Sequence, residues 1–269
     1  LFFSCEKNKK NNDTMNSSND SLSIYLTSSL NQNFSAAQRL KFNKKAYFVL
    51  SNSINDSISR NNLFNVAFSF RALGNNKELK KTISLILQRS EEENDTLSIA
   101  RSYNLLGNYN IELNQNDSAY YYLLKSEKLF YKLKDSLGLG QNYLDKAYVQ
   151  MYESDYSGGE QSAIKSLEYF KNGKNAFRFY DAYNVIGVSS NELKNYDNAL
   201  IYHAKALKET KDKNFPIALH LGPNSLNNIG VVYQYQNNYK EAVGQFQLAL
   251  KEKDLLKDNP ALYAMIVDN

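Results

Sequence analysis

Few side chains in this sequence have the chemistry of catalysis, and their spacing assembles no catalytic set. The histidines are His203 and His220, and the single cysteine is Cys5. The two histidines are not spaced as a metal-binding pair, and no cysteine lies near either of them. Gly138 and Gly140 form a GLG stretch that lacks the third glycine and the preceding strand of a dinucleotide-binding loop. The sequence therefore predicts a chain that is not an enzyme as it stands and that uses no metal and no cofactor.

The composition favours a folded chain built of long helices. The 269 residues are 42% hydrophobic and 13% aromatic, and only three are proline, so a core can form and helices are rarely interrupted. The net charge of +4 is mild, and we find no long run of Lys and Arg. Nucleic-acid binding by this region therefore has little electrostatic support. No run of 18 apolar residues is present to span a membrane.

Three segments, YNLLG, YNVIG and LNNIG, each carry an asparagine three residues before a glycine, and this marks an internal repeat. The small residue falls at a step of 40 residues three times and then at a step of 43, at Ala67, Gly107, Ala147, Gly187 and Gly230. A second small position follows twelve residues later, at Ala119, Gly159, Ala199 and Ala242, with Leu79 as the exception. Turn-forming residues lie between the two positions. Each unit is therefore predicted to be a helix, a short polar turn and a second helix.

The repeats divide the chain into three parts. Residues 1–19 form an apolar stub and a polar tether, residues 20–259 form the array with a degenerate first pair of helices, and residues 260–269 begin a further helix. Asn259 is the expected N-cap of that helix and Pro260 its first residue. A glycine inside a helix costs about 1 kcal/mol relative to alanine. We expect that Gly107 and its equivalents let each first helix approach its own second helix closely.

The repeats resemble the tetratricopeptide repeat family. The last unit carries the pattern most fully, at Leu226, Ile229, Gly230, Tyr233, Ala242, Phe246 and Ala249. The resemblance implies an all-α fold, a right-handed superhelical solenoid of about six helix-turn-helix repeats. The 40-residue step exceeds the family's usual length of roughly 34 residues, so longer helices are expected. His203 takes a consensus aromatic position, which favours a packed structural role over catalysis, and His220 is expected to be solvated.

The resemblance also implies where a ligand binds, because first helices in this family line a groove that holds a protein or peptide. The amides expected there are Asn104, Asn184 and Asn227, with Asn108 and Asn228 nearby and Tyr148 and Tyr152 between them. A side-chain amide donates and accepts hydrogen bonds, so it can pair with a peptide backbone of any sequence. The alternative is that asparagine here only solvates a helix face. Arg101 is the one residue comparable with the clamp that holds chaperone C-termini, so that function is disfavoured.

The opening LFFSC resembles the bacterial lipobox, in which the cysteine becomes the lipidated first residue of a mature lipoprotein. Cys5 is the lipidation candidate, although Phe2 stands where leucine is usual, and an incidental cysteine is the alternative. The resemblance implies the periplasmic side of a cell envelope and membrane attachment through the lipid or an adjoining segment. The favoured function is the sensory region of a sensor histidine kinase or a helix-turn-helix regulator. A stand-alone envelope scaffold and a cytosolic peptide adaptor remain alternatives, and the oligomeric state stays open.

Overall fold

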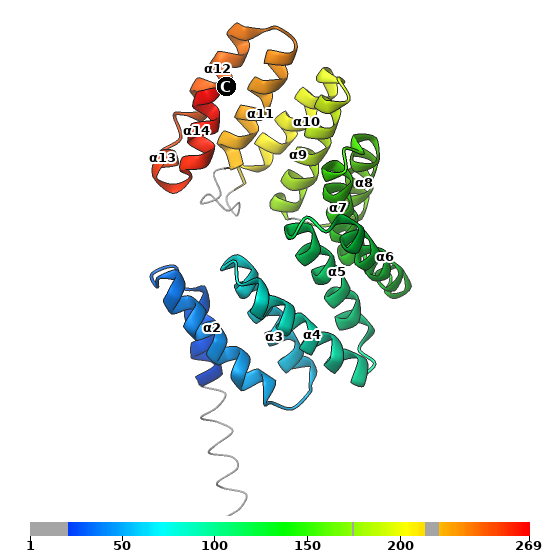
Figure 1. Cartoon of the computed structure of the whole chain (residues 1–269). Helices are drawn as coiled ribbons and strands as arrows, with labels where there is room; N and C mark the ends of the chain where they lie inside the picture. Colours follow the sequence, from blue (N-terminus) through cyan, green and yellow to red (C-terminus); the bar gives the residue numbers. More distant parts are fainter. Residues whose placement is uncertain (1–20, 174, 213–220) are drawn as a thin grey trace, which may run out of the picture. The chain divides into compact units, whose positions relative to one another are not determined.

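A computed structural model describes residues 21–173, 175–212 and 221–269, and the described chain is helical without strands. The chain divides into two compact units, Leu1–Leu113 and Asn114–Asn269. The division falls in the turn between helices α5 and α6, and each unit is described by itself (Figure 1).

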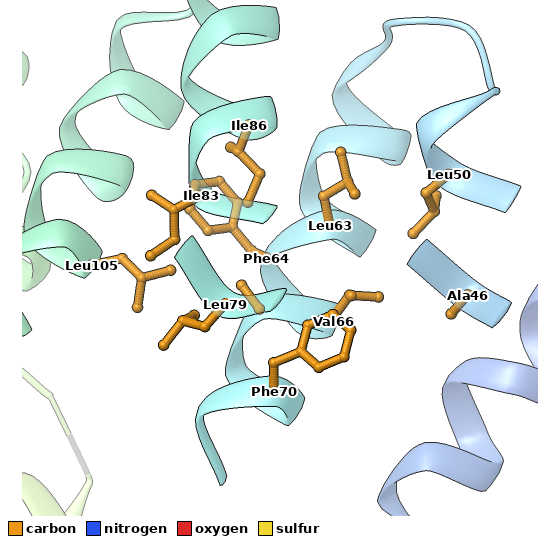
Figure 2. Close-up of a cluster of buried hydrophobic side chains, with 11 residues drawn as sticks. Ala46, Leu50, Leu63, Phe64, Val66, Phe70, Leu79, Ile83, Ile86 and Leu105 are labelled. Atoms are coloured by element: carbon orange, nitrogen blue, oxygen red, sulfur yellow. The ribbon is translucent and has the colours of Figure 1, made fainter. Parts of the chain in front are cut away.

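The first unit begins with a helix over residues 21–30. The helices that follow are α2 (Ala36–Ser51), α3 (Ser57–Ala72), α4 (Asn76–Glu92) and α5 (Thr96–Glu112). Within this unit α2 packs against α3, α3 against α4 and α4 against α5. Figure 2 shows their shared core, in which the rings of Phe64 and Phe70 lie among aliphatic side chains from α2, α4 and α5.

The second unit continues the same arrangement. Its helices are α6 (Asn116–Leu133), α7 (Ser136–Tyr152), α8 (Tyr156–Phe170), α9 (Ala176–Glu192), α10 (Tyr196–Glu209), α11 (Leu221–Tyr235), α12 (Tyr239–Ala249), α13 (Leu255–Asp258) and α14 (Pro260–Asp268). Consecutive helices from α6 to α12 pack pairwise, and α9 also contacts α7 and α11. The first helices of neighbouring repeats, α7, α9 and α11, therefore lie side by side.

In the turns after α3, α4, α6, α7 and α9, one residue ends a helix and the next residue caps the following helix. In the turn after α3, Gly74 has a φ of +65°, and the N–H of Asn75 donates back to the Phe70 carbonyl at 2.9 Å. The side chain of Asn75 then accepts a hydrogen bond from the N–H of Glu78 and caps α4. The same left-handed backbone conformation recurs at Asn94, Asn114, Lys134, Ser154, Lys194 and Asn237. This chemistry of a Schellman end and an Asx cap explains why Asn and Asp crowd the turns.

Two glycines of the first helices, Gly187 and Gly230, make room for aromatic rings, whereas Gly107 has Leu123 sixteen residues later. A methyl group on Gly187 would lie 2.6 Å from Cε1 of His203 on α10, and one on Gly230 would lie 2.7 Å from Cδ1 of Phe246 on α12. Both distances are far inside ordinary van der Waals contact. The expected close approach of the two helices is therefore made by a ring of the second helix, lying on the bare backbone of the first.

Repeats that carry alanine in place of glycine also carry a smaller partner. Each ring lies sixteen residues after its glycine. The residues sixteen after Ala67 and Ala147 are Ile83 and Ala163, and each pair is buried in one core. A smaller side chain at the position of the ring leaves room for the methyl group of the alanine.

The second small position is buried in every repeat, and Leu79, the exception, is equally buried. Helices of 17 and 18 residues in most repeats account for the 40-residue step. Asn259 caps α14 and Pro260 occupies its first turn, as predicted. The tether at residues 1–19 and His220 lie outside the described residues, as does much of the segment that lengthens one step to 43 residues.

Substitution of Gly230 tests the ring contact. We expect Gly230→Ala to lower the free energy of unfolding by roughly 1–3 kcal/mol, because the buried ring of Phe246 must move. The control is Gly244→Ala on α12, where an added methyl meets nothing within 4 Å. The control gains helix propensity and is expected to change stability by at most about 1 kcal/mol, in the stabilising direction. Urea unfolding midpoints compare the two, and equal midpoints would contradict the ring contact.

Candidate functional site

The first helices present a polar and aromatic surface in each unit, which we call the first-helix face. In the first unit it comes from α3 and α5, and in the second unit from α7, α9 and α11. Its members in the first unit are Asn61, Phe68, Arg101, Asn104 and Asn108. Its members in the second unit are Gln141, Tyr148, Tyr152, Asp181, Asn184, Asn224 and Asn228.

In the first unit, Arg101 links α5 to α3. Its Nη1 donates to the amide oxygen of Asn61 at 3.0 Å, and its guanidinium carbon lies 4.1 Å from the ring centroid of Phe64. A cation held over an aromatic face in this way gains about 0.5–1 kcal/mol at an accessible site. Further along the same helices, Arg71 forms an ion pair with Glu112. Arg101 therefore holds two repeats in register.

Asn104 and Asn108 lie one helical turn apart on α5 and are both half-buried. The side-chain nitrogen of Asn108 donates to the backbone carbonyl of Asn104 at 3.1 Å. That bond engages part of the Asn108 amide with its own helix. The structure thus brings these two expected groove residues together on one face.

In the second unit, the hydroxyl of Tyr148 on α7 donates to the carboxylate of Asp181 on α9. Burial, aided by the nearby Asp145, raises the pKa of Asp181 to about 6, although the bond from Tyr148 acts in the opposite direction. The ring of Tyr152 lies 6.5 Å from that of Tyr148 between centroids, and Tyr152 is 60% exposed. Tyr148 is therefore tied to its neighbour, and Tyr152 is the accessible aromatic side chain.

Asn184 and Asn228 form a bond between neighbouring first helices. The nitrogen of the Asn228 amide on α11 donates to the amide oxygen of Asn184 on α9 at 2.9 Å. Both residues are half-buried. Within the described chain, neither the Asn184 amide nitrogen nor the Asn228 amide oxygen has another partner. The pair thus presents one donor group and one acceptor group.

Asn227 is placed differently from the other expected groove residues. It is 3% exposed, and its amide oxygen accepts a hydrogen bond from Asn269 at 3.0 Å, just beyond the end of α14. Its neighbour Asn228 takes the position beside Asn184. Ligand binding by any of these residues remains a prediction.

The sequence analysis missed Asp181 as a member of the face. Asp181 lies six residues before Gly187, which is the place that Arg101 occupies before Gly107. The repeat step therefore held the signal. The position six residues before the small residue is occupied by Arg101, Gln141 and Asp181 in turn, so the charge at this position changes sign along the array.

The remaining candidates are structural or lie outside the described chain. His203 is 1% exposed, and burial lowers its pKa to about 4, which suits a packed neutral ring. Gly138 and Gly140 lie inside α7, where a methyl on either would meet the ring of Phe130 or Phe170. Cys5 lies outside the described residues. No grouping of three or more His, Cys, Asp or Glu side chains that could hold a metal ion occurs in the described part. Nor does any described helix have the length and apolarity to cross a bilayer.

Comparison with known proteins identifies one repeat and the fold. The sequence model of the tetratricopeptide repeat matches residues 224–252, which include α11 and α12. The chain carries a tetratricopeptide repeat there. The same hairpins recur from α3 to α12, so the resemblance read from the sequence is confirmed as a tetratricopeptide fold. None of the curated protein sequences compared with the chain matches it.

Solved structures share the tetratricopeptide fold over most of the chain. A signal transduction ATPase with a tetratricopeptide repeat sensor, from Pyrococcus horikoshii, aligns with a TM-score of 0.67 at 16% identity, over 86% of this chain and 33% of its own. BtubC from P. vanneervenii aligns with a TM-score of 0.63 at 16% identity, over 85% of this chain and 89% of its own. The apo form of RapI gives a TM-score of 0.63 at 19% identity, over 93% and 71%. At these identities the likeness shows the fold alone.

Replacement of His203 by phenylalanine tests its structural role. The folded pKa of His203, about 4, lies below the usual value of about 6.5. The unfolded chain therefore binds the proton more tightly, and the parent protein loses stability as the pH falls from 6.5 to 4. His203→Phe should remove that loss, on the order of 1–3 kcal/mol at pH 4, because the ring at this place need carry no charge. Unfolding midpoints between pH 4 and pH 7 check this, and identical pH profiles for the two proteins would contradict it.

Proposed function

We propose that this tetratricopeptide module binds an extended peptide, or an extended segment of a partner protein, on the first-helix face of the second unit. A protein-interaction module is the function that the repeat and fold support. The observation that carries the finer proposal is the bonded pair of Asn184 and Asn228, which keeps one amide nitrogen and one amide oxygen for a ligand.

The pair suits a peptide backbone because an extended chain offers a carbonyl acceptor and an N–H donor in alternation. Asn184 supplies the donor and Asn228 the acceptor. Their mutual bond fixes both side chains before binding, so little rotamer freedom is lost when the ligand arrives. Recognition through the backbone makes affinity depend weakly on ligand sequence at this point.

Two neighbouring side chains add selectivity on the same face. Tyr152 presents an accessible aromatic surface on α7, suited to an apolar anchor of the ligand. Asp181 presents a carboxylate held by Tyr148, which favours a ligand with an N–H or a basic group nearby. A peptide lying across α7, α9 and α11 would meet all of these groups in turn.

The double variant Asn184→Ala/Asn228→Ala tests the proposal. The probe is a peptide selected from a random display library on the immobilised full chain. Loss of two hydrogen bonds, each about 0.5–1.5 kcal/mol, should weaken it roughly tenfold. The control is Gln161→Ala/Gln247→Ala, which removes exposed amides from the second helices α8 and α12 and should leave affinity unchanged. Equal affinity in both double variants, measured by calorimetry, would reject the amide pair as the binding site.

We further propose that the module is the extracytoplasmic input region of a bacterial membrane signalling protein. The lipobox-like LFFSC supports this placement, and the Pyrococcus horikoshii ATPase offers a parallel in which a tetratricopeptide array serves as the sensor. A stand-alone lipoprotein scaffold and a cytosolic adaptor are the alternatives. Mass spectrometry of the protein from its natural host tests the location. A diacylglyceryl thioether on Cys5 supports attachment to the cell envelope, and an unmodified Cys5 thiol inside the chain points to a cytosolic adaptor.

A further inference from the structure

A basic groove lies at the start of the array, in the first unit. It has a volume of about 780 Å³ and is formed by the helix over residues 21–30 and by α2. Its lining includes Tyr25, Leu40 and Val49, which are half-buried, together with Phe48, which is 70% exposed. An exposed aromatic residue beside a half-buried apolar floor marks a surface suited to a partner.

Three lysines surround the apolar floor of this groove. Lys41, Lys44 and Lys45 are all exposed and all line it. The Nζ of Lys45 lies 5.3 Å from the ring centroid of Tyr25, which holds this charge beside the floor. With Phe48 they follow spacings of three and four residues, so they share one face of α2. The face from Ala37 to Phe48 is about 16 Å long at 1.5 Å per residue, the length of three helical turns.

No acidic side chain from this part of the chain offsets the lysines. Residues 21–55 hold Arg39, Lys41, Lys44 and Lys45 and not a single Asp or Glu, so the segment carries four positive charges and no negative ones. The sequence analysis missed this stripe because the basic residues form no long run along the chain. Only the turn of the helix gathers three of them at one groove.

We propose that this groove binds an acidic amphipathic α-helix of a partner protein. A helix fits the available length, its apolar side chains would lie on Leu40, Val49 and Phe48, and its carboxylates would meet the three lysines. Such charge complementarity speeds association and selects among partners. This site is separate from the amide pair and does not depend on it.

The charges favour a partner helix over other occupants. Residues 1–20 carry Lys7, Lys9 and Lys10 against Glu6, Asp13 and Asp20, so they have no net charge to offer. A second copy of the chain offers no acidic helix among α2–α14; the most acidic carry one net negative charge, as α8 does with Glu160 and Glu168 against Lys165. A lipid bilayer is flat on this scale, whereas Leu40 and Val49 lie half-buried within a groove.

The test uses the full chain and two fluorescent helical peptides. Both peptides have the same pattern of leucines, and their flanking positions are glutamate in one and lysine in the other. We expect the acidic peptide to bind, more weakly at high salt, and the basic one not to bind. Lys41→Glu/Lys44→Glu should weaken the acidic peptide by about tenfold or more, since two attractions become repulsions. Fluorescence anisotropy gives these affinities.

Matched controls separate the groove from general charge and exposure. Lys77→Glu/Lys80→Glu makes the same charge change at exposed lysines of α4 and should leave the affinity within about twofold. Phe48→Ala should weaken binding, and Ile58→Ala, at an equally exposed residue, should not. The variant Asn184→Ala/Asn228→Ala should bind the acidic peptide with unchanged affinity. The test of the groove therefore stands even when the amide pair binds no peptide.

Several outcomes would overturn the proposal. One is equal binding of both peptides, or binding that Lys41→Glu/Lys44→Glu leaves unchanged. Another is no peptide binding together with charge-dependent sedimentation with phosphatidylserine vesicles, which would assign the groove to lipid. A concentration-dependent dimer that the same variant abolishes would assign it to a second copy. A photo-crosslinker in place of Phe48 that reacts with residues 1–20 would assign it to the chain itself.

Discussion

The packing of an aromatic ring on a bare helix backbone is the contact on which this array depends. Gly187 receives the ring of His203 and Gly230 that of Phe246, each within one hairpin. α7 takes two rings, from Phe130 of the preceding helix and from Phe170 of its partner. A glycine in a helix costs about 1 kcal/mol, whereas burial of a whole ring gains about 1.5–3 kcal/mol. The gain from packing exceeds the cost in helix propensity, so the glycines persist in the middle of long helices.

The candidate binding face depends on the spacing of neighbouring first helices. In the second unit the first helices of successive repeats lie near enough to bond directly. Tyr148 reaches Asp181, and Asn228 reaches Asn184. The short turns contribute to this close approach, because one left-handed residue and one capping residue join two helices without a longer loop. Bonds between neighbouring first helices therefore hold the face that we propose as a binding site.

Much of this arrangement could be predicted from the sequence, because the repeat multiplies every weak signal. The helices, their pairing and the places of the small residues follow from the 40-residue step and from the apolar spacing. The side-chain partners did not follow. Asn227 and Asn228 are adjacent in the sequence, yet the first is buried against Asn269 and the second bonds to Asn184, a difference set by about 100° of helix rotation. Arg89 likewise donates to the carbonyls of Leu50, Ser51 and Ser53, a contact between repeats that no local pattern encodes.

A double-mutant cycle on Gly187 and His203 tests the ring contact most directly. Gly187→Ala alone should overpack the site, and His203→Ala alone should leave a cavity. Together they recreate the pair of alanines that the array already uses at Ala147 and Ala163. The account predicts that the double variant is more stable than the sum of the single changes implies, by about 1 kcal/mol or more. Free energies of unfolding that add within about 0.5 kcal/mol would show that the two positions are not coupled and would contradict the account.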